Sequence, residues 1–521
     1  MIFRSRFPDV EIPEVSLAEF VIDKAAAYGD RPALIDGPSG RIVTYAALAG
    51  TVRALAAGLA RRGFGKGDVF AVYSPNLPEY AAVLHAVAML GGITTTVNPL
   101  YTARELGEQL ADAGARFLIT VPPLLERARE ASRHAGLKEV FVFGEAKEAT
   151  SFASLLKRGD SVPKVSIAPR TDVVVMPYSS GTTGLPKGVM LTHHNLVANI
   201  CQTEPLFATE IERVIAVLPF YHIYGLTVLL NISLHRGDTV ITMPRFDLEQ
   251  FLQLLQQHGV TRAYLVPPIV LALAKHPLVE KYNLGALRSI NSGAAPLGGN
   301  VEQACGDRLN CFVAQGYGLT ETSPVVSTTP IDPAVRRAGS AGLLIPNTEC
   351  KVVDPASGAE LEANQQGEVC VRGPQVMKGY LNQPAATSAM LEPEGWLHTG
   401  DIGMVDQDGY LFIVDRLKEL IKYKAFQVAP AELESLLLKH PAVADAAVIP
   451  HPDAEAGEVP KAFVVMKGQA SPDELMAFVN EQVAPFKKIR LLEVVDQIPK
   501  SPAGKILRRT LIERERSHAG A

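Results

Sequence analysis

The sequence has few cysteines, and their spacing gives no sign of a disulfide or zinc framework. The five cysteines are Cys201, Cys305, Cys311, Cys350 and Cys370, and no two of them form a Cys-x-x-Cys pair. An odd number of unpaired cysteines is typical of proteins from reducing compartments. We therefore expect free thiols and a cytoplasmic location.

Long apolar runs and a strong net charge are also lacking. A membrane-spanning helix needs about 20 apolar residues, whereas the most apolar run, 80–97, includes a histidine, a glycine pair and three threonines. A net charge of −5 over 521 residues excludes a polybasic coat for nucleic acid. The first residues do not resemble a secretory signal, and the last do not form a peroxisomal address. We expect no nucleic-acid partner and no stable membrane insertion.

The chain does have an α/β rhythm. Apolar runs typical of buried parallel strands lie at 69–73, 117–121, 140–143 and 173–176. Between the early runs are helical stretches rich in alanine and leucine, at 48–62 and 104–113. After about residue 330, short strands separated by glycine and aspartate turns predict an antiparallel, barrel-like subdomain. A smaller unit follows, with a helix predicted at 430–439.

These patterns predict an α/β protein of two domains. The large N-terminal domain, 1–415, would contain layered α/β subdomains and the β-barrel-like subdomain. The C-terminal part, 416–521, is long enough to be a separate small α+β domain.

A polar loop at 178–188, Tyr-Ser-Ser-Gly-Thr-Thr-Gly-Leu-Pro-Lys-Gly, follows an apolar strand. Hydroxyls and backbone N–H groups can donate hydrogen bonds to phosphate oxygens, glycine lets the backbone approach, and lysine adds a positive charge. The loop is not a Walker A motif, because Pro186 precedes Lys187 and Gly188 follows it. From these residues alone, a phosphate loop and an ordinary polar turn remain about equally open.

The whole string resembles the phosphate loop of the adenylate-forming enzymes: acyl-CoA synthetases, luciferases and peptide-synthetase adenylation domains. Four further segments are similar to motifs of this family, in its order and spacing. They are 316–321 (Gly-Tyr-Gly-Leu-Thr-Glu), 396–401 (Trp-Leu-His-Thr-Gly-Asp), 415–419 (Asp-Arg-Leu-Lys-Glu) and 499–505 (Pro-Lys-Ser-Pro-Ala-Gly-Lys). Residues 367–373, Gly-Glu-Val-Cys-Val-Arg-Gly, are similar to a box of 4-coumarate–CoA ligases, with valine twice in place of isoleucine.

The resemblance implies a reaction in two steps. A carboxylate attacks the α-phosphate of MgATP to give an acyl-adenylate and pyrophosphate, and the thiol of coenzyme A then displaces AMP. ATP, Mg²⁺, coenzyme A and a small carboxylic acid are therefore the expected ligands of a monomer or homodimer. The N-terminal domain, 1–415, would bind ATP and the acyl group. Because the steps need different faces of the small domain, we expect the C-terminal domain, 416–521, to be a mobile lid that carries the catalytic lysine and rotates between the steps.

The resemblance also assigns residues to nucleotide and coenzyme A binding: Ser179, Ser180, Gly181, Thr182, Thr183, Gly184, Lys187, Ala294, Ala295, Gln315, Gly316, Tyr317, Thr320, Asp401, Arg416, Lys424 and Ala425. Asp401 would accept both ribose hydroxyls, and Arg416 would approach the ribose or the phosphates. Glu321 would hold Mg²⁺, a hard cation that suits a carboxylate. Lys418 occupies the hinge position.

Catalytic roles fall, by the same resemblance, on Lys505, Lys422, Gln427 and His222. Lys505 would bridge the substrate carboxylate and the α-phosphate and stabilise the charge that develops in adenylation. A lysine near the end of a chain is ordinarily a solvated surface charge. The proline- and glycine-framed loop that contains Lys505 favours the catalytic interpretation.

The predicted acyl pocket is largely apolar, and is formed by Tyr224, Asn291, Gly293, Ala294, Gly316, Gly318, Pro324 and Val325. No acidic residue occurs over 220–230, where relatives that activate amino acids place an aspartate. An amino-acid substrate is therefore disfavoured. The pocket indicates aryl, cinnamic-type or medium-chain acids, as in phenylpropanoid or acyl activation.

One position departs from the family pattern. Ala425 stands where the family has glycine, on a loop beside the passage for the pantetheine thiol. The added Cβ is harmless if φ is negative, and the enzyme is then a normal coenzyme A ligase. Alternatively the methyl group slows the thioester step, and the acyl group passes to an amine or another acceptor. A luciferase-like enzyme and a non-catalytic binding module are further alternatives, whereas a Rossmann dehydrogenase lacks its glycine fingerprint.

Overall fold

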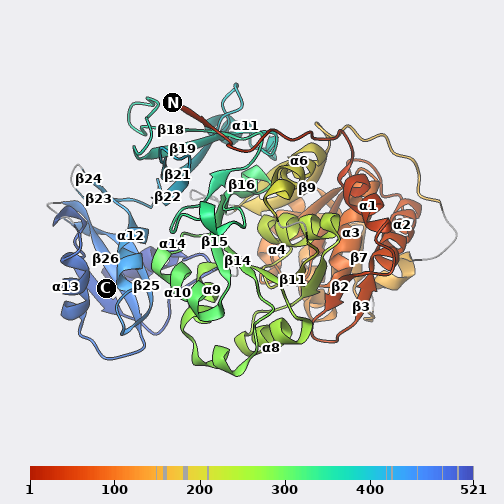
Figure 1. Ribbon diagram of the computed structural model, residues 1–521. Coiled ribbons are helices and arrows are strands. Elements are labelled where there is room, and N and C mark those ends of the chain that lie inside the picture. The colour runs from red at the N-terminus through yellow and green to blue at the C-terminus, as the bar shows by residue number, and fades with distance from the viewer. Residues whose placement is uncertain are drawn as a thin grey trace.

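The computed structural model describes most of the chain (Figure 1). The described residues are 1–147, 149–156, 161–179, 186–207, 210–417, 419–423, 426–453, 456–483, 485–501 and 504–519. They form an α/β fold around four sheets of eight, nine, five and five strands.

The eight-stranded sheet is parallel through its centre, and its strands run in the order β20-β10-β9-β5-β4-β6-β7-β8. Their bounds are β4 (Val69–Tyr73), β5 (Ile93–Val97), β6 (Ala115–Thr120), β7 (Glu139–Val142), β8 (Thr150–Ser151), β9 (Val173–Ser179), β10 (Lys187–Thr192) and β20 (Gly379–Tyr380). All five residues of β4 are buried. The apolar runs predicted as parallel strands therefore are such strands. The accompanying helices are α2 (Tyr45–Arg61), α3 (Pro78–Met89), α4 (Ala103–Asp112) and α5 (Leu125–Ala135).

The nine-stranded sheet follows the order β17-β16-β15-β14-β13-β11-β12-β2-β3, and its six central strands are parallel. The bounds are β2 (Pro32–Asp36), β3 (Ile42–Thr44), β11 (Arg213–Ala216), β12 (Thr239–Thr242), β13 (Arg262–Leu265), β14 (Ser289–Ser292), β15 (Phe312–Gly318), β16 (Val325–Thr328) and β17 (Leu343–Leu344). The other helices of the large body are α1 (Lys24–Ala26), α6 (His193–Thr203), α7 (Ser233–Arg236), α8 (Leu248–His258), α9 (Pro267–Lys275) and α10 (Gly299–Leu309), and α6 contacts β10 of the eight-stranded sheet. In parallel sheets, ligands bind at the carboxyl ends of the strands.

The antiparallel subdomain predicted after residue 330 is a five-stranded sheet, ordered β1-β18-β19-β21-β22. Its elements are β1 (Ile2–Arg4), β18 (Glu349–Val353), β19 (Gly367–Arg372), β21 (Leu397–Val405), β22 (Leu411–Arg416) and the nearby helix α11 (Pro384–Met390). The first strand of the chain thus pairs with a strand almost 350 residues later, as the red and teal ribbons of Figure 1 show.

The last part of the chain has a sheet and apolar cores of its own. Its elements are β23 (Ile421–Tyr423), β24 (Phe426–Val428), α12 (Pro430–Leu437), β25 (Val443–Asp453), β26 (Gly457–Met466), α13 (Pro472–Asn480), β27 (Leu491–Val494) and α14 (Arg508–Ala519). In Figure 1 this blue unit lies beside α9 and α10. Lys275 of α9 donates a 3.3 Å hydrogen bond to the Leu438 carbonyl across the junction.

Within the described ranges, none of the helices combines the length and the apolar character that crossing a bilayer requires. This finding agrees with the absence of a long apolar run in the sequence.

Candidate active site

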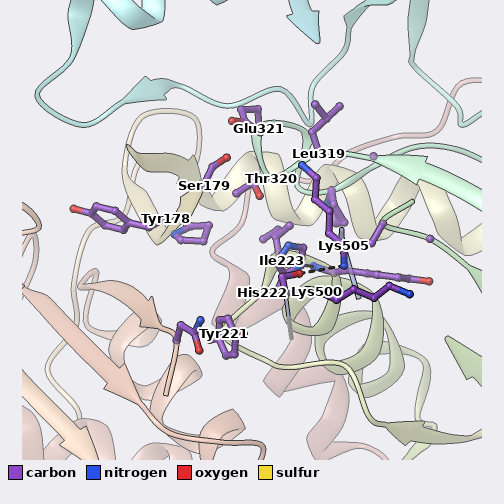
Figure 2. Close-up of a pocket in the computed structure, with 18 of the residues that line it drawn as sticks. Tyr178, Ser179, Tyr221, His222, Ile223, Leu319, Thr320, Glu321, Lys500 and Lys505 are labelled. Atoms are coloured by element: carbon purple, nitrogen blue, oxygen red, sulfur yellow. Dashed lines mark hydrogen bonds between the residues drawn. The ribbon is translucent and has the colours of Figure 1, made fainter. Parts of the chain in front are cut away.

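A cavity of about 1110 Å³ lies between the large body and the C-terminal unit (Figure 2). Its walls include His222 and Tyr224, the ends of β14 and β15, and Lys505 from the C-terminal unit. Segments almost 300 residues apart in sequence therefore meet around one space. A concave site with several converging polar groups is the usual form of a binding or catalytic pocket.

One corner of the cavity contains a carboxylate suited to a divalent cation. Glu321 follows β15, is only 6% exposed and lines the cavity. The Tyr380 hydroxyl donates a 2.8 Å hydrogen bond to its Oε1. Among the described residues, no hydrogen-bond donor is recorded at Oε2, so this oxygen is available to a hard cation. The donor chemistry here fits Mg²⁺.

Behind a second corner stands Asp401 of β21, which is 4% exposed and does not itself line the cavity. The Tyr317 hydroxyl donates a 2.6 Å hydrogen bond to Oδ2, and Arg416 Nε lies 3.2 Å from Oδ1. Burial raises the pKa of Asp401, and the charge of Arg416 and the Tyr317 hydrogen bond counteract that rise. Tyr317 and Arg416 line the cavity directly. The structure thus brings together three residues that the sequence assigned to nucleotide binding.

Lys505 lies on a tight turn. The Lys505 N–H donates to Ser501 Oγ at 3.2 Å, and the Ser501 N–H donates to the Lys505 carbonyl at 2.8 Å. Gly504 has a φ of +75°, and a Cβ at this position would lie 2.9 Å from Cγ2 of Val266 on the large body. The turn therefore needs glycine both for its backbone conformation and for the close approach to the body.

The positive charge of Lys505 acts on the protonation of His222. Figure 2 shows the Lys505 side chain pointing toward His222. Burial lowers the pKa of Lys505 and the Arg416 charge lowers it further, while Glu419 and Asp401 raise it. Burial, followed by the charge of Lys505, lowers the pKa of His222 to about 4. His222 is therefore uncharged at neutral pH where it faces Lys505.

The wall between these corners is the segment after β14. Ala294 has a φ of +69°, a left-handed conformation that is uncommon for a residue with a Cβ, and lines the cavity. Gln315 and Ala295, both predicted to bind the nucleotide, do not line the cavity. The Gln315 side chain instead donates to the Leu297 carbonyl at 3.0 Å and accepts from the Leu297 N–H at 2.9 Å. Gln315 therefore supports the wall from behind.

The remaining predicted pocket residues are brought together. Those that line the cavity are Ser179, Tyr224, Asn291, Gly293, Ala294, Gly316, Gly318, Thr320, Pro324 and Val325. Tyr224 begins a π-helix, Tyr224–Ile232, and its hydroxyl donates a 3.3 Å hydrogen bond to the Asn291 carbonyl. Short π-helical segments frequently occur at functional sites.

The part of the cavity beside Tyr224 and Asn291 has an aromatic end that the sequence did not reveal. Tyr264 and Phe207 line the cavity, and the Tyr264 ring stands edge-on to Tyr224 with 6.4 Å between ring centres. The Tyr264 hydroxyl accepts a 3.3 Å hydrogen bond from buried Arg262. Tyr264 begins the apolar stretch 264–274, in which no residue type or spacing pointed to a pocket.

A second arm of the cavity was also missed. It passes Tyr221 and reaches the end of β5 and the start of α4, where its lining residues are Thr96, Asn98, Leu100, Tyr101, Glu105 and Gln109. The Thr96 hydroxyl donates a 2.6 Å hydrogen bond to the carbonyl of Tyr221, the residue before His222. No motif in this stretch pointed to the site.

Several predicted residues stand apart from the cavity. Lys422 is exposed on β23 and does not line it, and Gln427 pairs with Lys422 through the β23–β24 ladder. Lys187 lies next to the Glu321 corner, with Nζ 5.0 Å from the centre of the Tyr380 ring. Eight predicted residues lie outside the described residues: Ser180, Gly181, Thr182, Thr183, Gly184, Lys418, Lys424 and Ala425.

Comparison with known proteins agrees with this geometry. The 4-coumarate--CoA ligase 1 of Solanum tuberosum is 44% identical over 524 residues, with 98% of this chain and 96% of the relative covered. The 4-coumarate--CoA ligase of Pinus taeda is 44% identical over 526 residues, with 98% and 97% covered.

Solved structures show the same fold. The anthranilate CoA ligase AuaEII in complex with anthranoyl-AMP matches with a TM-score of 0.90 at 24% identity, covering 98% of this chain and 99% of that one. The amide bond synthetase McbA from Marinactinospora thermotolerans matches with a TM-score of 0.85 at 27% identity, covering 95% and 99%. The predicted fold class is confirmed.

Family models match both parts of the chain. Residues 21–381 match the family described as AMP-binding enzyme, and residues 432–505 match the AMP-binding enzyme C-terminal domain. The resemblance seen in the sequence is therefore confirmed, and the chain belongs to the AMP-binding enzyme family.

Proposed function

We propose that the protein is an ATP-dependent carboxylate–CoA ligase that forms an acyl-adenylate and then a CoA thioester. The observation that carries this proposal is the convergence of Lys505 with Glu321, Tyr317 and Arg416 on one cavity. The 4-coumarate--CoA ligases at 44% identity over almost the whole chain support coenzyme A as the acceptor.

The arrangement suits the joining of two anions. A carboxylate that approaches the α-phosphate meets electrostatic repulsion, which the ammonium group of Lys505 reduces while it aligns both groups. Neutral His222 can form a hydrogen bond there without adding charge. Thr320, which lines the same wall, offers a hydroxyl to the α-phosphate. Adenylation is thus promoted by charge neutralisation and positioning.

The nucleotide would be held at the two polar corners. Asp401 accepts the ribose hydroxyls, with Arg416 and Tyr317 fixing its carboxylate. Glu321 would hold Mg²⁺, which when bound neutralises phosphate charge. Lys187 and the hydroxyls of the polar loop at 178–188 would contact the outer phosphates.

The thioester step needs a different face of the C-terminal domain, which we place at 416–521 against an N-terminal domain at 1–415. Lys505 faces the cavity while Lys422 is exposed outside it. Rotation about Lys418 would exchange Lys505 for the segment with Lys422, Lys424, Ala425 and Gln427. The second arm of the cavity, toward Tyr101, offers a route for the thiol.

The acid is of an aryl, cinnamic or medium-chain type. The acyl group would occupy the part of the cavity beside Tyr224 and Asn291, which we call the acyl arm. This arm ends at the rings of Tyr224, Tyr264 and Phe207, which favour contact with flat or aliphatic groups. A second candidate function is transfer of the acyl group to an amine. The similarity to the amide bond synthetase McbA and the alanine at position 425 both favour testing it.

Exchange of labelled pyrophosphate into ATP, with a panel of benzoic, cinnamic and C6–C12 fatty acids, tests adenylation. Product analysis by mass spectrometry with coenzyme A, with an amine, or with neither then identifies the acceptor. We expect acid-dependent exchange and a CoA thioester. Absence of exchange with every acid would overturn adenylation, and amides without thioesters would favour the second function.

A further inference from the structure

Behind the ribose corner, outside the cavity, lies a cluster of charged side chains that the proposed reaction does not use. The imidazole of His398 is held between two carboxylates: Nδ1 lies 3.0 Å from Glu368 Oε2, and Nε2 lies 2.8 Å from Glu392 Oε1. Lys351 Nζ lies 3.4 Å from the other oxygen of Glu392, and Cys370 Sγ lies 3.5 Å from His398 Nδ1. Strands β18, β19 and β21 are tied together here.

The cluster is connected to Asp401 through the backbone. The second oxygen of Glu368, Oε1, accepts a 3.0 Å hydrogen bond from the Gly400 N–H. Gly400 has a φ of +67°, a left-handed conformation that costs glycine little. Asp401 comes next, and its own N–H donates to Thr399 Oγ1 at 3.1 Å. The irregular stretch of β21 that aims the Asp401 carboxylate, where the register with β19 shifts, is thus held by Glu368.

We propose that Glu368 and His398 are positioning residues for nucleotide binding: they fix the β21 backbone at Gly400 and so hold the Asp401 carboxylate where it meets the ribose hydroxyls. This inference rests on the proposed function, because it takes Asp401 to be the ribose ligand. Precise placement of a binding group depends on neighbours that lock its geometry.

The protonation state of His398 decides whether the cluster is intact. Only the imidazolium donates from both ring nitrogens, and so only that form satisfies Glu368 and Glu392 together. Burial opposes the charge, but the hydrogen bonds to Glu368 and Glu392 outweigh it and raise the pKa of His398. The groups that face the ring are Glu368 and Cys370 from β19 and Glu392, with Lys351 from β18 behind Glu392. Below this raised pKa, a single imidazolium therefore bridges both carboxylates.

The test compares two nucleotides in the full-length protein. Dissociation constants are measured by calorimetry for ATP and for 2′,3′-dideoxy-ATP, which cannot use Asp401 for its ribose. Loss of one charge-assisted contact changes affinity by about tenfold. We expect Glu368→Gln to weaken ATP by about that factor and to change dideoxy-ATP less than about twofold.

The outcomes separate the positioning role of Glu368 from the assignment of Asp401 to the ribose. Equal weakening of both nucleotides, or no weakening of either, would overturn the positioning role. Glu394→Gln, at an exposed glutamate in the same 392–396 turn, is the control and should leave both constants unchanged. Asp401→Asn tests the premise separately: if it does not reduce the preference for ATP over dideoxy-ATP, the ribose assignment fails rather than the link through Glu368.

A pH series gives a readout that a purely structural role would not move. As pH rises through the raised pKa of His398, the ring loses a proton and the contact with Glu368 weakens. The preference of the wild type for ATP over dideoxy-ATP should therefore fall with rising pH. In His398→Gln the preference should be low and independent of pH. Parallel pH profiles in the two proteins would contradict the proposal.

Discussion

Lys187 lies over the ring of Tyr380, with its Nζ atom 5.0 Å from the ring centre. The hydroxyl of the same tyrosine donates to Glu321, so a single side chain contacts both the cation of the β10 strand and the candidate metal ligand. Burial raises the pKa of Tyr380, and the negative charge of Glu321 raises it further, which keeps the phenol protonated as a donor. Tyr380 thus orients Glu321.

Tyr380→Phe should therefore weaken Mg²⁺ binding while leaving the ring beneath Lys187 in place. Removing a partner that orients a metal ligand typically costs roughly tenfold in metal affinity. We expect the Mg²⁺ concentration for half-maximal ATP–pyrophosphate exchange to rise by about that factor. Tyr410→Phe, where a tyrosine bonds to the Val335 carbonyl away from the cavity, is the matched control. An unchanged Mg²⁺ requirement in Tyr380→Phe would count against this role.

The sequence predicts the site well where a short motif carries the chemistry. Glu321, Asp401 and Lys505 each lie in a segment that resembles a family motif, and the structure brings these segments to one cavity or its immediate wall. The parallel strands could be predicted from the sequence equally well, because a strand buried on both faces is an unbroken apolar run. A short stretch of sequence therefore predicts both the motif residues of the site and the buried parallel strands.

The contacts that support those residues could not be predicted in this way. Glu368 reaches Gly400 across 32 residues, and Tyr380 reaches Glu321 across 59. Such contacts depend on strand register, which no short pattern records. For Gln315 the motif predicted too much. This residue lies next to a motif and was expected to bind the nucleotide, but its side chain forms hydrogen bonds with Leu297 behind the cavity wall.

Lys505→Ala should separate the two half-reactions. The variant lacks the cation that lies between the two anions in adenylation, and losses of about 10²- to 10³-fold follow removal of one such stabilising group. Thioester formation from a supplied acyl-adenylate should be largely retained. Lys439→Ala, at an exposed lysine of the same unit, should leave both rates unchanged. Equal losses in both half-reactions would refute the assignment.

Gly504→Ala should slow adenylation for a different reason. A methyl group at this position meets Val266 at 2.9 Å and also strains a backbone with φ of +75°. The approach of the Lys505 turn to the large body is then disfavoured, while the thioester step, which does not need this approach, is retained. Gly358→Ala introduces the same type of backbone strain at φ of +72°, but its methyl group meets no atom within 4 Å. The difference between the two variants therefore measures the effect of the contact with Val266. Similar adenylation rates in the two variants would contradict the explanation.

The pH dependence of the adenylation rate should reflect the loss of the proton from Lys505. Because burial and Arg416 lower its pKa, this lysine loses its charge below the ordinary lysine value of about 10.4. The kcat/KM of exchange should therefore fall on an alkaline limb that begins below that value. Lys505→Arg keeps a guanidinium that stays charged, so any activity that remains should lack this limb. The same alkaline limb in both proteins would assign it to another group.

Tyr264 should set the length of acid that the enzyme accepts. Its ring closes the acyl arm beside Phe207 and Tyr224, and Tyr264→Ala opens that end. Because one methylene in such a pocket changes kcat/KM by roughly 10-fold or more, the preferred chain length or ring substituent should shift to a larger acid. Tyr264→Phe keeps the ring and removes only the hydroxyl that accepts from Arg262, so it should retain the wild-type ranking of acids. Large-to-small changes in cores cost about 3–5 kcal/mol, so melting temperatures accompany the kinetics. A stable Tyr264→Ala protein with the wild-type ranking would place the end of the acyl pocket elsewhere.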